Sequence, residues 1–123
     1  MKVLLSIRPE YAEKIFNGKK KYEYRRVIFK NRNIHSIVVY ATKPIKKIIG
    51  EFEIDEILSD RPNKIWEKTY KYSGISKEYF DLYTNSKEII YAIKIGNYKL
   101  YQKPKLLTCK KKIKSAPQSF IYI

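Results

Sequence analysis

Short runs of β-forming residues recur along the whole chain, and this pattern constrains the fold more than any other feature of the sequence. Most runs are rich in valine, isoleucine, tyrosine and phenylalanine, and turn-forming residues bound them. The pattern predicts strands at residues 3–7, 20–29, 36–42, 48–58, 88–101 and 119–123. Gly50 in the fourth run predicts a bulge or a close backbone approach. We expect a turn at Gly96-Asn97 in the fifth run, and we expect Lys103-Pro104 to end that strand.

Three segments switch instead to the three- and four-residue spacing of apolar side chains that is typical of helices. Residues 8–18 form the first, with Pro9 suited to the first turn and Gly18 to a left-handed cap. Residues 62–74 and 75–85 form the other two, and we expect their large side chains to pack on the sheet rather than form an aromatic cage. These side chains are Trp66, Tyr70, Tyr79 and Tyr83, and the predicted helical face of residues 75–85 consists of Ile75, Tyr79, Leu82 and Tyr83.

The order of these segments predicts a single α+β domain over residues 1–123, because no repeat or linker interrupts it. Many short strands and few helices favour a small, partly closed, mixed β-barrel over a layered βαβ fold. We expect about five to six strands with flanking α-helices.

The balance of charges narrows the choice of partner. Lysine and arginine total 27 against 12 aspartate and glutamate residues, which gives a formal net charge of +15. A compositional bias toward lysine explains the lysines better than it explains the shortage of acidic residues. A nucleic-acid partner is therefore the main expectation. A solvated basic surface without a specific partner is the first alternative, and a membrane surface is the least favoured.

Several kinds of site are disfavoured by the composition. One cysteine and one histidine leave no disulfide framework and argue against a zinc site or a Ser-His-Asp triad. We therefore expect no metal and no cofactor. No apolar stretch approaches the ~20 residues of a membrane span, and charged residues interrupt the N-terminal apolar run. A cytoplasmic protein without a membrane partner is expected.

Four residues with a fixed spacing, Gly18, Lys20, Glu23 and Arg25, mark the turn and strand after the first predicted helix. Glu23 and Arg25 share one strand face, roughly 7 Å apart at ~3.3 Å per residue. Lys20 can fold over the same face. The three charges are compatible with a solvated ion pair worth only ~0–1 kcal/mol, or with the lining of a binding cleft.

The spacing Gly18-x-Lys20-x-x-Glu23-x-Arg25 matches the G-x-K-x-x-E-x-R signature of ASCH domains, a branch of the PUA-like superfamily. The chain also resembles small bacterial and phage ASCH proteins labelled as transcriptional regulators, at residues 6–18, 40–54, 74–83 and 116–123. The resemblance implies a PUA-like mixed barrel with a cleft beside the first helix, lined by the signature residues and generally proposed to bind RNA or nucleotides. Some members are reported as hydrolases of single-stranded RNA or of N-acetylated cytidine. The latter branch carries threonine where this chain has Glu23.

The main hypothesis from these observations is that the protein binds nucleic acid, with RNA favoured over DNA, through a basic ligand cleft. A regulatory role is one function that such binding would serve. The expected ligand-binding residues are Arg8, Lys20, Tyr22, Glu23, Arg25, Thr42 and Lys43. An ordinary turn is the simpler interpretation of Thr42 and Lys43. Packing in the barrel is the simpler interpretation of at least one of Tyr22 and Tyr24.

Two other classes of function stay open. A metal-independent hydrolase would use Lys20, Glu23 and Arg25 as catalytic residues on single-stranded RNA or on an acylated nucleoside. Glu23 would be the general base and Lys20 or Arg25 the electrostatic stabiliser, unless burial lowers the pKa of Lys20 enough to make it the base. A protein-interaction module with incidental charge is the remaining class. The lysine run at residues 110–114 is expected to be solvated, with non-specific phosphate contact as its alternative.

Overall fold

The computed structural model describes residues 1–109 and 115–123, so the lysine run at residues 110–114 lies outside the described residues. The helices are α1 (Pro9–Phe16), α2 (Pro62–Thr69) and α3 (Lys77–Thr84), with short 3-10 helices η1 (Tyr70–Tyr72) and η2 (Leu107–Cys109). The strands are β1 (Val3–Ile7), β2 (Tyr22–Arg25), β3 (Ser36–Ala41), β4 (Lys47–Asp60), β5 (Ile90–Lys105) and β6 (Phe120–Tyr122). Each predicted strand is present, although β2 is shorter than the predicted run of residues 20–29.

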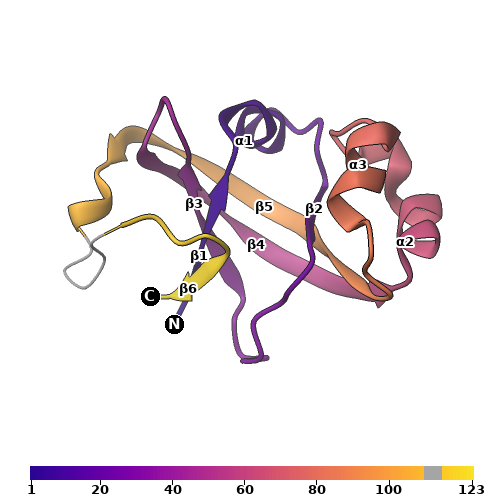
Figure 1. The fold of residues 1–123 in the computed structure, drawn as a ribbon. Coiled ribbons are helices and arrows are strands. Elements are labelled where there is room, and N and C mark those ends of the chain that lie inside the picture. Colours follow the sequence, from indigo (N-terminus) through magenta and orange to yellow (C-terminus); the bar gives the residue numbers. More distant parts are fainter. Residues whose placement is uncertain (110–114) are drawn as a thin grey trace.

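The strands of the described chain form one six-stranded sheet in the order β2-β5-β4-β3-β1-β6. β1 pairs in parallel with β3, and the other neighbouring strands are antiparallel. β4 and β5 are the longest, with 14 and 16 residues, and the sheet curls along them into a half-barrel (Figure 1). The predicted small, partly closed mixed barrel of an α+β fold is confirmed.

β2 and β6 are the two edges of the sheet, and the curl brings the ends of these edges toward each other. Arg25, the last residue of β2, donates a hydrogen bond from Nη2 to the carbonyl oxygen of Ser119 at 2.9 Å. Ser119 immediately precedes β6. The two edges are not neighbours in the sheet, so side chains rather than a backbone ladder connect them here.

β5 differs from its prediction. It runs unbroken from Ile90 to Lys105, so the expected turn at Gly96-Asn97 and the expected end at Lys103-Pro104 are both wrong. The pairing register between β4 and β5 shifts near Gly96, but the chain does not reverse there. β2 pairs only with Tyr91 to Lys94. Pro104 therefore lies on a stretch of β5 whose other side has no partner strand, where a missing N–H donor is tolerated.

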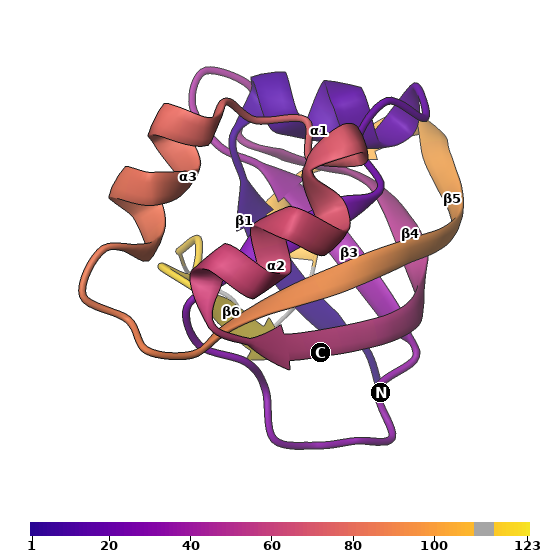
Figure 2. The same cartoon turned by 90° about the vertical axis from the view of Figure 1, so that its right-hand side faces the viewer.

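The helices contact the sheet at two places, with α1 against β3 and β5 and with α2 and α3 at one end, the end that faces the viewer in Figure 2 (Figures 1 and 2). α1 buries Ala12 and Ile15, as its spacing predicts. In α3 the predicted inner face is right for Tyr83, which packs against the core, but wrong for Leu82, which is 77% exposed while Phe80 is buried in its place. Ser76 caps α3 by accepting a hydrogen bond from the Tyr79 backbone N–H at 3.0 Å, and Phe80 packs against the rings of Tyr24 and Trp66.

Gly50 marks a close contact between β4, β5 and α1, as predicted. A Cβ atom at this residue would lie 2.5 Å from the Lys99 carbonyl oxygen and 2.6 Å from the ring of Phe16. The pairing register also shifts beside it. Only a residue without a side chain allows α1 to approach this closely.

None of the described helices is both long and apolar enough to cross a membrane.

Candidate functional site

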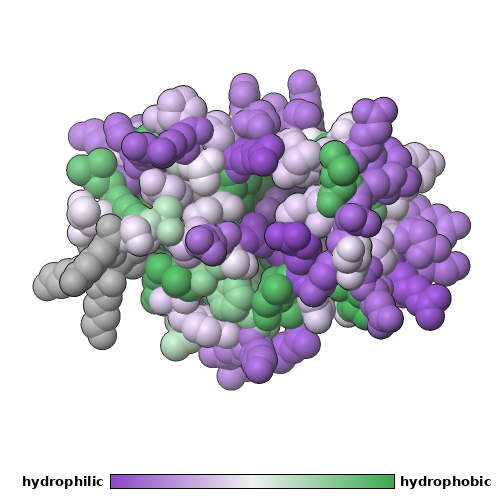
Figure 3. All heavy atoms as spheres, viewed as in Figure 1, coloured by the Kyte–Doolittle hydropathy of each residue, from purple (hydrophilic) through white to green (hydrophobic). Residues whose placement is uncertain are grey.

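A cavity of about 400 Å³ lies where the two edges of the half-barrel approach each other. The end of β1, α1, β2, α3 and the segment before β6 all contribute to its wall. The charged residues that line it are Arg8, Lys20, Glu23, Arg25 and Arg26. In the space-filling view, hydrophilic side chains cover the end formed by α2 and α3 and reach the centre of this face between hydrophobic groups (Figure 3). Among the described charged residues of the cavity wall, four cations therefore face one carboxylate.

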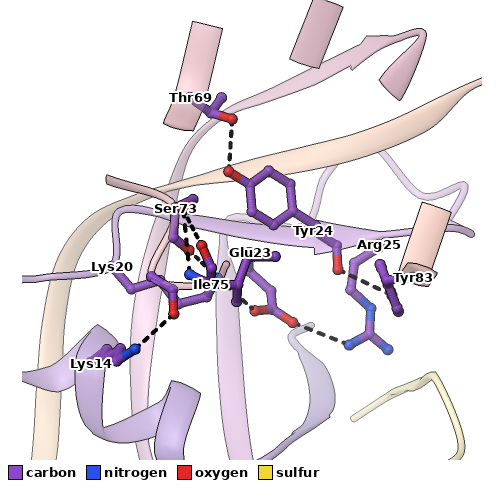
Figure 4. A network of polar contacts seen from close by, with 10 residues as sticks. Lys14, Lys20, Glu23, Tyr24, Arg25, Thr69, Ser73, Ile75 and Tyr83 are labelled. Atoms are coloured by element: carbon purple, nitrogen blue, oxygen red, sulfur yellow. Dashed lines mark hydrogen bonds and ion pairs between the residues drawn. The ribbon is translucent and has the colours of Figure 1, made fainter. Parts of the chain in front are cut away.

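Lys20 is the most deeply buried charged residue of this wall, with 2% of its surface exposed. Its Nζ donates a hydrogen bond to the carbonyl oxygen of Ser73 at 2.6 Å and lies 3.9 Å from Glu23 Oε1 (Figure 4). The ring centroid of Tyr24 is 4.9 Å from Nζ. Burial lowers the pKa of Lys20 from 10.5 to about 8, against the opposing effect of the Glu23 charge. Lys20 can therefore exchange its proton close to neutral pH.

The turn after α1 places Lys20 in this position. Gly18 has a φ of +82°, the left-handed conformation predicted for it. The Lys20 backbone N–H donates to the Lys14 carbonyl oxygen at 2.9 Å, and the Lys21 backbone N–H donates to the Tyr72 carbonyl oxygen at 2.9 Å. Gly18 thus ends the helix, and the residues that follow it lie against η1.

Glu23 lies between two cations. Its Oε1 faces Lys20, and its Oε2 accepts a hydrogen bond from Arg25 Nη1 at 3.3 Å. Arg25 Nη2 donates to the Ser119 carbonyl oxygen at 2.9 Å and to Ser119 Oγ at 3.3 Å. Glu23 and Arg25 are only 7% and 9% exposed. The trio is therefore a buried, hydrogen-bonded network in a cavity wall, which differs from a solvated surface ion pair.

Tyr24 supports the network from the core. Its hydroxyl lies 2.7 Å from Thr69 Oγ1, and Thr69 Oγ1 donates its own proton to the Ile65 carbonyl oxygen at 2.7 Å. Tyr24 is therefore the donor to Thr69. Burial raises the pKa of Tyr24 to about 12, so its hydroxyl stays neutral. The expectation that at least one of Tyr22 and Tyr24 packs in the barrel is confirmed.

Tyr79 and Tyr83 line the cavity, although the sequence predicted only core packing for them. Their rings stack with centroids 6.1 Å apart and an interplanar angle of 11°. Their spacing of one helical turn indicated a shared face but not what that face contacts. Arg26 and Ser119 also line the cavity. No local pattern marks Ser119, which reaches the site only because β6 pairs with β1.

The structure brings together four of the seven expected ligand-binding residues. These four are Arg8, Lys20, Glu23 and Arg25. Tyr22 is instead half-buried against the core beneath α2 and α3. Thr42 and Lys43 follow β3, where the Thr42 carbonyl oxygen accepts a turn hydrogen bond from the Ile45 backbone N–H at 3.0 Å. Neither of these two residues lines the cavity.

Known proteins match both the sequence and the fold. The family model of the ASCH domain matches residues 5–99 of this chain. The crystal structure of ASCH from Zymomonas mobilis matches with a TM-score of 0.90 and 25% sequence identity, covering 99% of this chain and 87% of that chain. The similarity thus includes the signature turn, the half-barrel and the segment that carries Ser119.

Two curated relatives match over shorter fractions of their own length. The ASCH domain-containing ribonuclease of Zymomonas mobilis is 31% identical over 85 residues, which is 69% of this chain and 57% of the relative. The large ribosomal subunit protein uL22 of Ureaplasma parvum serovar 3 is 28% identical over 124 residues, which is 98% of this chain and 39% of the relative. The chain therefore spans less than two thirds of either relative. The match of the family model across most of the chain shows that this protein belongs to the ASCH domain family.

Proposed function

We propose that this protein binds single-stranded RNA and takes one nucleotide unit into the cavity between β2 and β6. The observation that carries the proposal is the position of the buried Lys20–Glu23–Arg25 network on the wall of that cavity. A volume of about 400 Å³ is in the range of sites that bind small ligands. A net charge of +15 supplies the long-range attraction for a polyanion.

The network supports recognition of a polar, anionic ligand because its charges are held in place before the ligand arrives. Glu23 and Ser119 fix the guanidinium of Arg25 from two sides. A preorganised donor loses little conformational entropy on binding. The name of one relative, the ASCH domain-containing ribonuclease, agrees with an RNA partner.

Cleavage of RNA without a metal ion is a second function that a specific observation favours. The pKa of Lys20 is lowered to about 8 by burial, which makes this side chain a feasible general base near neutral pH. Neutral Lys20 would take the proton of a ribose 2′-hydroxyl, whose oxygen then forms a bond to the adjacent phosphorus. The bond from phosphorus to the 5′-oxygen breaks, the leaving oxygen takes a proton from water, and the Lys20 ammonium returns its proton to the solvent.

Glu23 is less suited to the role of base than Lys20, because both of its oxygens face cations. In this scheme Glu23 orients Lys20 and Arg25, and Arg25 stabilises the negative charge that develops on phosphate oxygens. Hydrolysis of an acylated nucleoside rests on the family resemblance alone, and Glu23 stands where that branch has threonine.

The binding proposal is tested by titrating a fluorescent single-stranded RNA with the protein at several salt concentrations. Affinity should fall by ~0.7 decades per decade of salt for each phosphate neutralised. Arg25→Gln and Lys64→Gln each remove one positive charge, and Lys64 is an exposed residue of α2 that does not line the cavity. If the cavity is the site, Arg25→Gln should weaken binding about tenfold or more, and Lys64→Gln only slightly.

Equal losses in the two variants would show that bulk charge rather than the cavity attracts RNA. Absence of wild-type binding at low salt would remove the proposed function altogether. Arg25→Lys keeps the charge but loses the fork geometry, and it provides a second test if Arg25→Gln does not fold.

The cleavage proposal is tested by incubating the same RNA with the protein in EDTA. Lys20→Met should abolish cleavage, and wild-type products should carry a 2′,3′-cyclic phosphate. Cleavage that survives Lys20→Met, or that EDTA abolishes, would contradict this chemistry.

A further inference from the structure

Two exposed arginines at the cavity, Arg8 and Arg26, are held by aromatic rings rather than by carboxylates. The Arg8 guanidinium carbon lies 5.3 Å from the ring centroid of Tyr79, and that of Arg26 lies 5.1 Å from the ring centroid of Tyr83. In the described part of the chain, neither guanidinium has an acidic side chain within ion-pairing distance. Their N–H donors are therefore available to an anion.

The stacked pair of Tyr79 and Tyr83 connects the two arginines. The rings lie 6.1 Å apart on successive turns of α3, and all four side chains line the same cavity. Arg8 comes from the end of β1 and Arg26 from the end of β2, so α3 holds cations that belong to separate strands. Contact with an aromatic face fixes a guanidinium without using its hydrogen-bond donors.

Arg25 provides the contrast. It belongs to the buried network, and part of its donor capacity is already used by Glu23 and Ser119. Glu23 is the one carboxylate among the described residues that line the cavity, and Lys20 and Arg25 are the cations beside it. Arg8 and Arg26 thus add two positive charges that no protein carboxylate at the cavity balances.

We propose that Arg8 and Arg26 each bind one of the two phosphates that flank a single nucleotide, so that the cavity recognises a 3′,5′-bisphosphate unit. Such a unit is an internal nucleotide of an RNA strand, and a free nucleoside or a nucleoside monophosphate lacks part of it. This inference rests on the proposed RNA-binding function and specifies the ligand unit of the same site. Charge-assisted hydrogen bonds from arginine to phosphate supply the affinity.

The test uses four adenine ligands and calorimetry with the wild-type protein. Adenosine 3′,5′-bisphosphate should bind about tenfold or more tightly than 5′-AMP or 3′-AMP, because each phosphate adds charge-assisted contacts. ADP is the control for added charge, since it carries two phosphates on one side of the ribose and should gain little affinity over 5′-AMP. ADP should bind more weakly than the bisphosphate. Equal affinities of ADP and the bisphosphate would overturn the proposal, since they would show that only charge is counted.

Two variants test which arginine binds which of the two phosphates. Arg8→Gln should weaken binding of the bisphosphate and of one monophosphate while sparing the other, and Arg26→Gln should show the opposite selectivity. Both residues are exposed, so neither change should disturb the fold, and Lys64→Gln again controls for lost charge. If both variants weaken all ligands equally, or weaken none, the arginines do not divide the phosphates and the inference fails.

The titration with single-stranded RNA separates this inference from the function on which it rests. RNA binding that depends on Arg25, combined with no preference for the bisphosphate over ADP, would leave the proposed function standing and overturn the inference. Bisphosphate selectivity without RNA binding would keep the two-phosphate site and overturn the RNA function.

Discussion

Lys20 and Gly74 are in such close contact that a side chain at residue 74 has no room. A Cβ atom on Gly74 would lie 2.7 Å from both Cβ and Cγ of Lys20. Gly74 also has a φ of +70°, in the left-handed region that disfavours other residues. The connection between η1 and α3 is thus packed onto the aliphatic part of the signature lysine, and Lys14 Nζ secures it by donating to the Gly74 carbonyl oxygen at 3.0 Å.

Gly74→Ala should therefore destabilise the protein and displace Lys20. We expect a loss of about 1–3 kcal/mol in the free energy of unfolding, from the strained φ and the overlap with Lys20. Denaturant unfolding measures it. Gly96→Ala is the matched control, because its φ is not positive and its Cβ would approach no closer than 3.3 Å to the Glu53 carbonyl oxygen. Similar losses in both variants would contradict a special role for the Lys20–Gly74 contact.

Glu23→Gln should destabilise the fold because it removes the charge that faces Lys20. Lys20 can lose its proton at a cost of about 1–2 kcal/mol near pH 7 because its pKa is about 8, so we expect a loss of about 1–3 kcal/mol at neutral pH. The double variant Lys20→Met/Glu23→Gln should recover part of that loss, because the buried ammonium is absent. Denaturant unfolding of the two single variants and the double variant gives the coupling energy. Strict additivity would show that the 3.9 Å contact of Lys20 with Glu23 does not matter energetically.

The free energy of unfolding should rise between about pH 7.5 and 9.5. The pKa of Lys20 is lowered from 10.5 to about 8 in the folded protein, so the unfolded chain binds more protons between these values. The unfolding free energy then increases with pH, by about 1–2 kcal/mol over this interval. Lys20→Met should lack this rise. The interval ends below pH 10 because tyrosines then begin to ionise in the unfolded chain. Burial raises the pKa of Tyr24 to about 12, so folded Tyr24 keeps its proton, and this difference lowers the unfolding free energy as the pH rises.

The outcome that contradicts this pH prediction is a rise of the same size in Lys20→Met and in the wild type. In that case other groups would dominate the pH dependence.

Tyr24→Phe should lower the free energy of unfolding by about 1 kcal/mol, because it removes a buried hydrogen bond to Thr69. Tyr22→Phe is the control. The Tyr22 side chain is half-buried, and its hydroxyl has no hydrogen-bond partner among the described residues. Thermal unfolding of both variants provides the comparison. Equal stability of the two variants would indicate that the Tyr24 hydroxyl is not a structural anchor.

Secondary structure was largely predictable because it depends on local physics. Pro9, Gly18 and Pro62 occupy the helix-terminal positions that their backbone preferences favour. The prediction failed at Gly96 and Leu82, where tertiary contacts override local preference. Pairing with β4 carries β5 straight through Gly96, and packing of Phe80 against Tyr24 and Trp66 leaves Leu82 in solvent.

The candidate site was predictable only in part. Lys20, Glu23 and Arg25 are close in sequence, so the spacing of a turn and a strand indicates that they meet. Ser119 lies 94 residues from Arg25 and Tyr79 belongs to a separate helix, so no local pattern connects them to the signature.

The sequence by itself determined the strands, the helices, the signature turn and the positive charge, because backbone preference, side-chain spacing and composition are properties of neighbouring residues. The tertiary structure alone decided that the sheet curls until β2 and β6 face each other, which makes a cavity out of two edges. It also decided the pKa of Lys20. Segments far away in the sequence, such as Gly74, cover this lysine, and burial lowers its pKa to about 8, since desolvation depends on what the folded chain places around a charge.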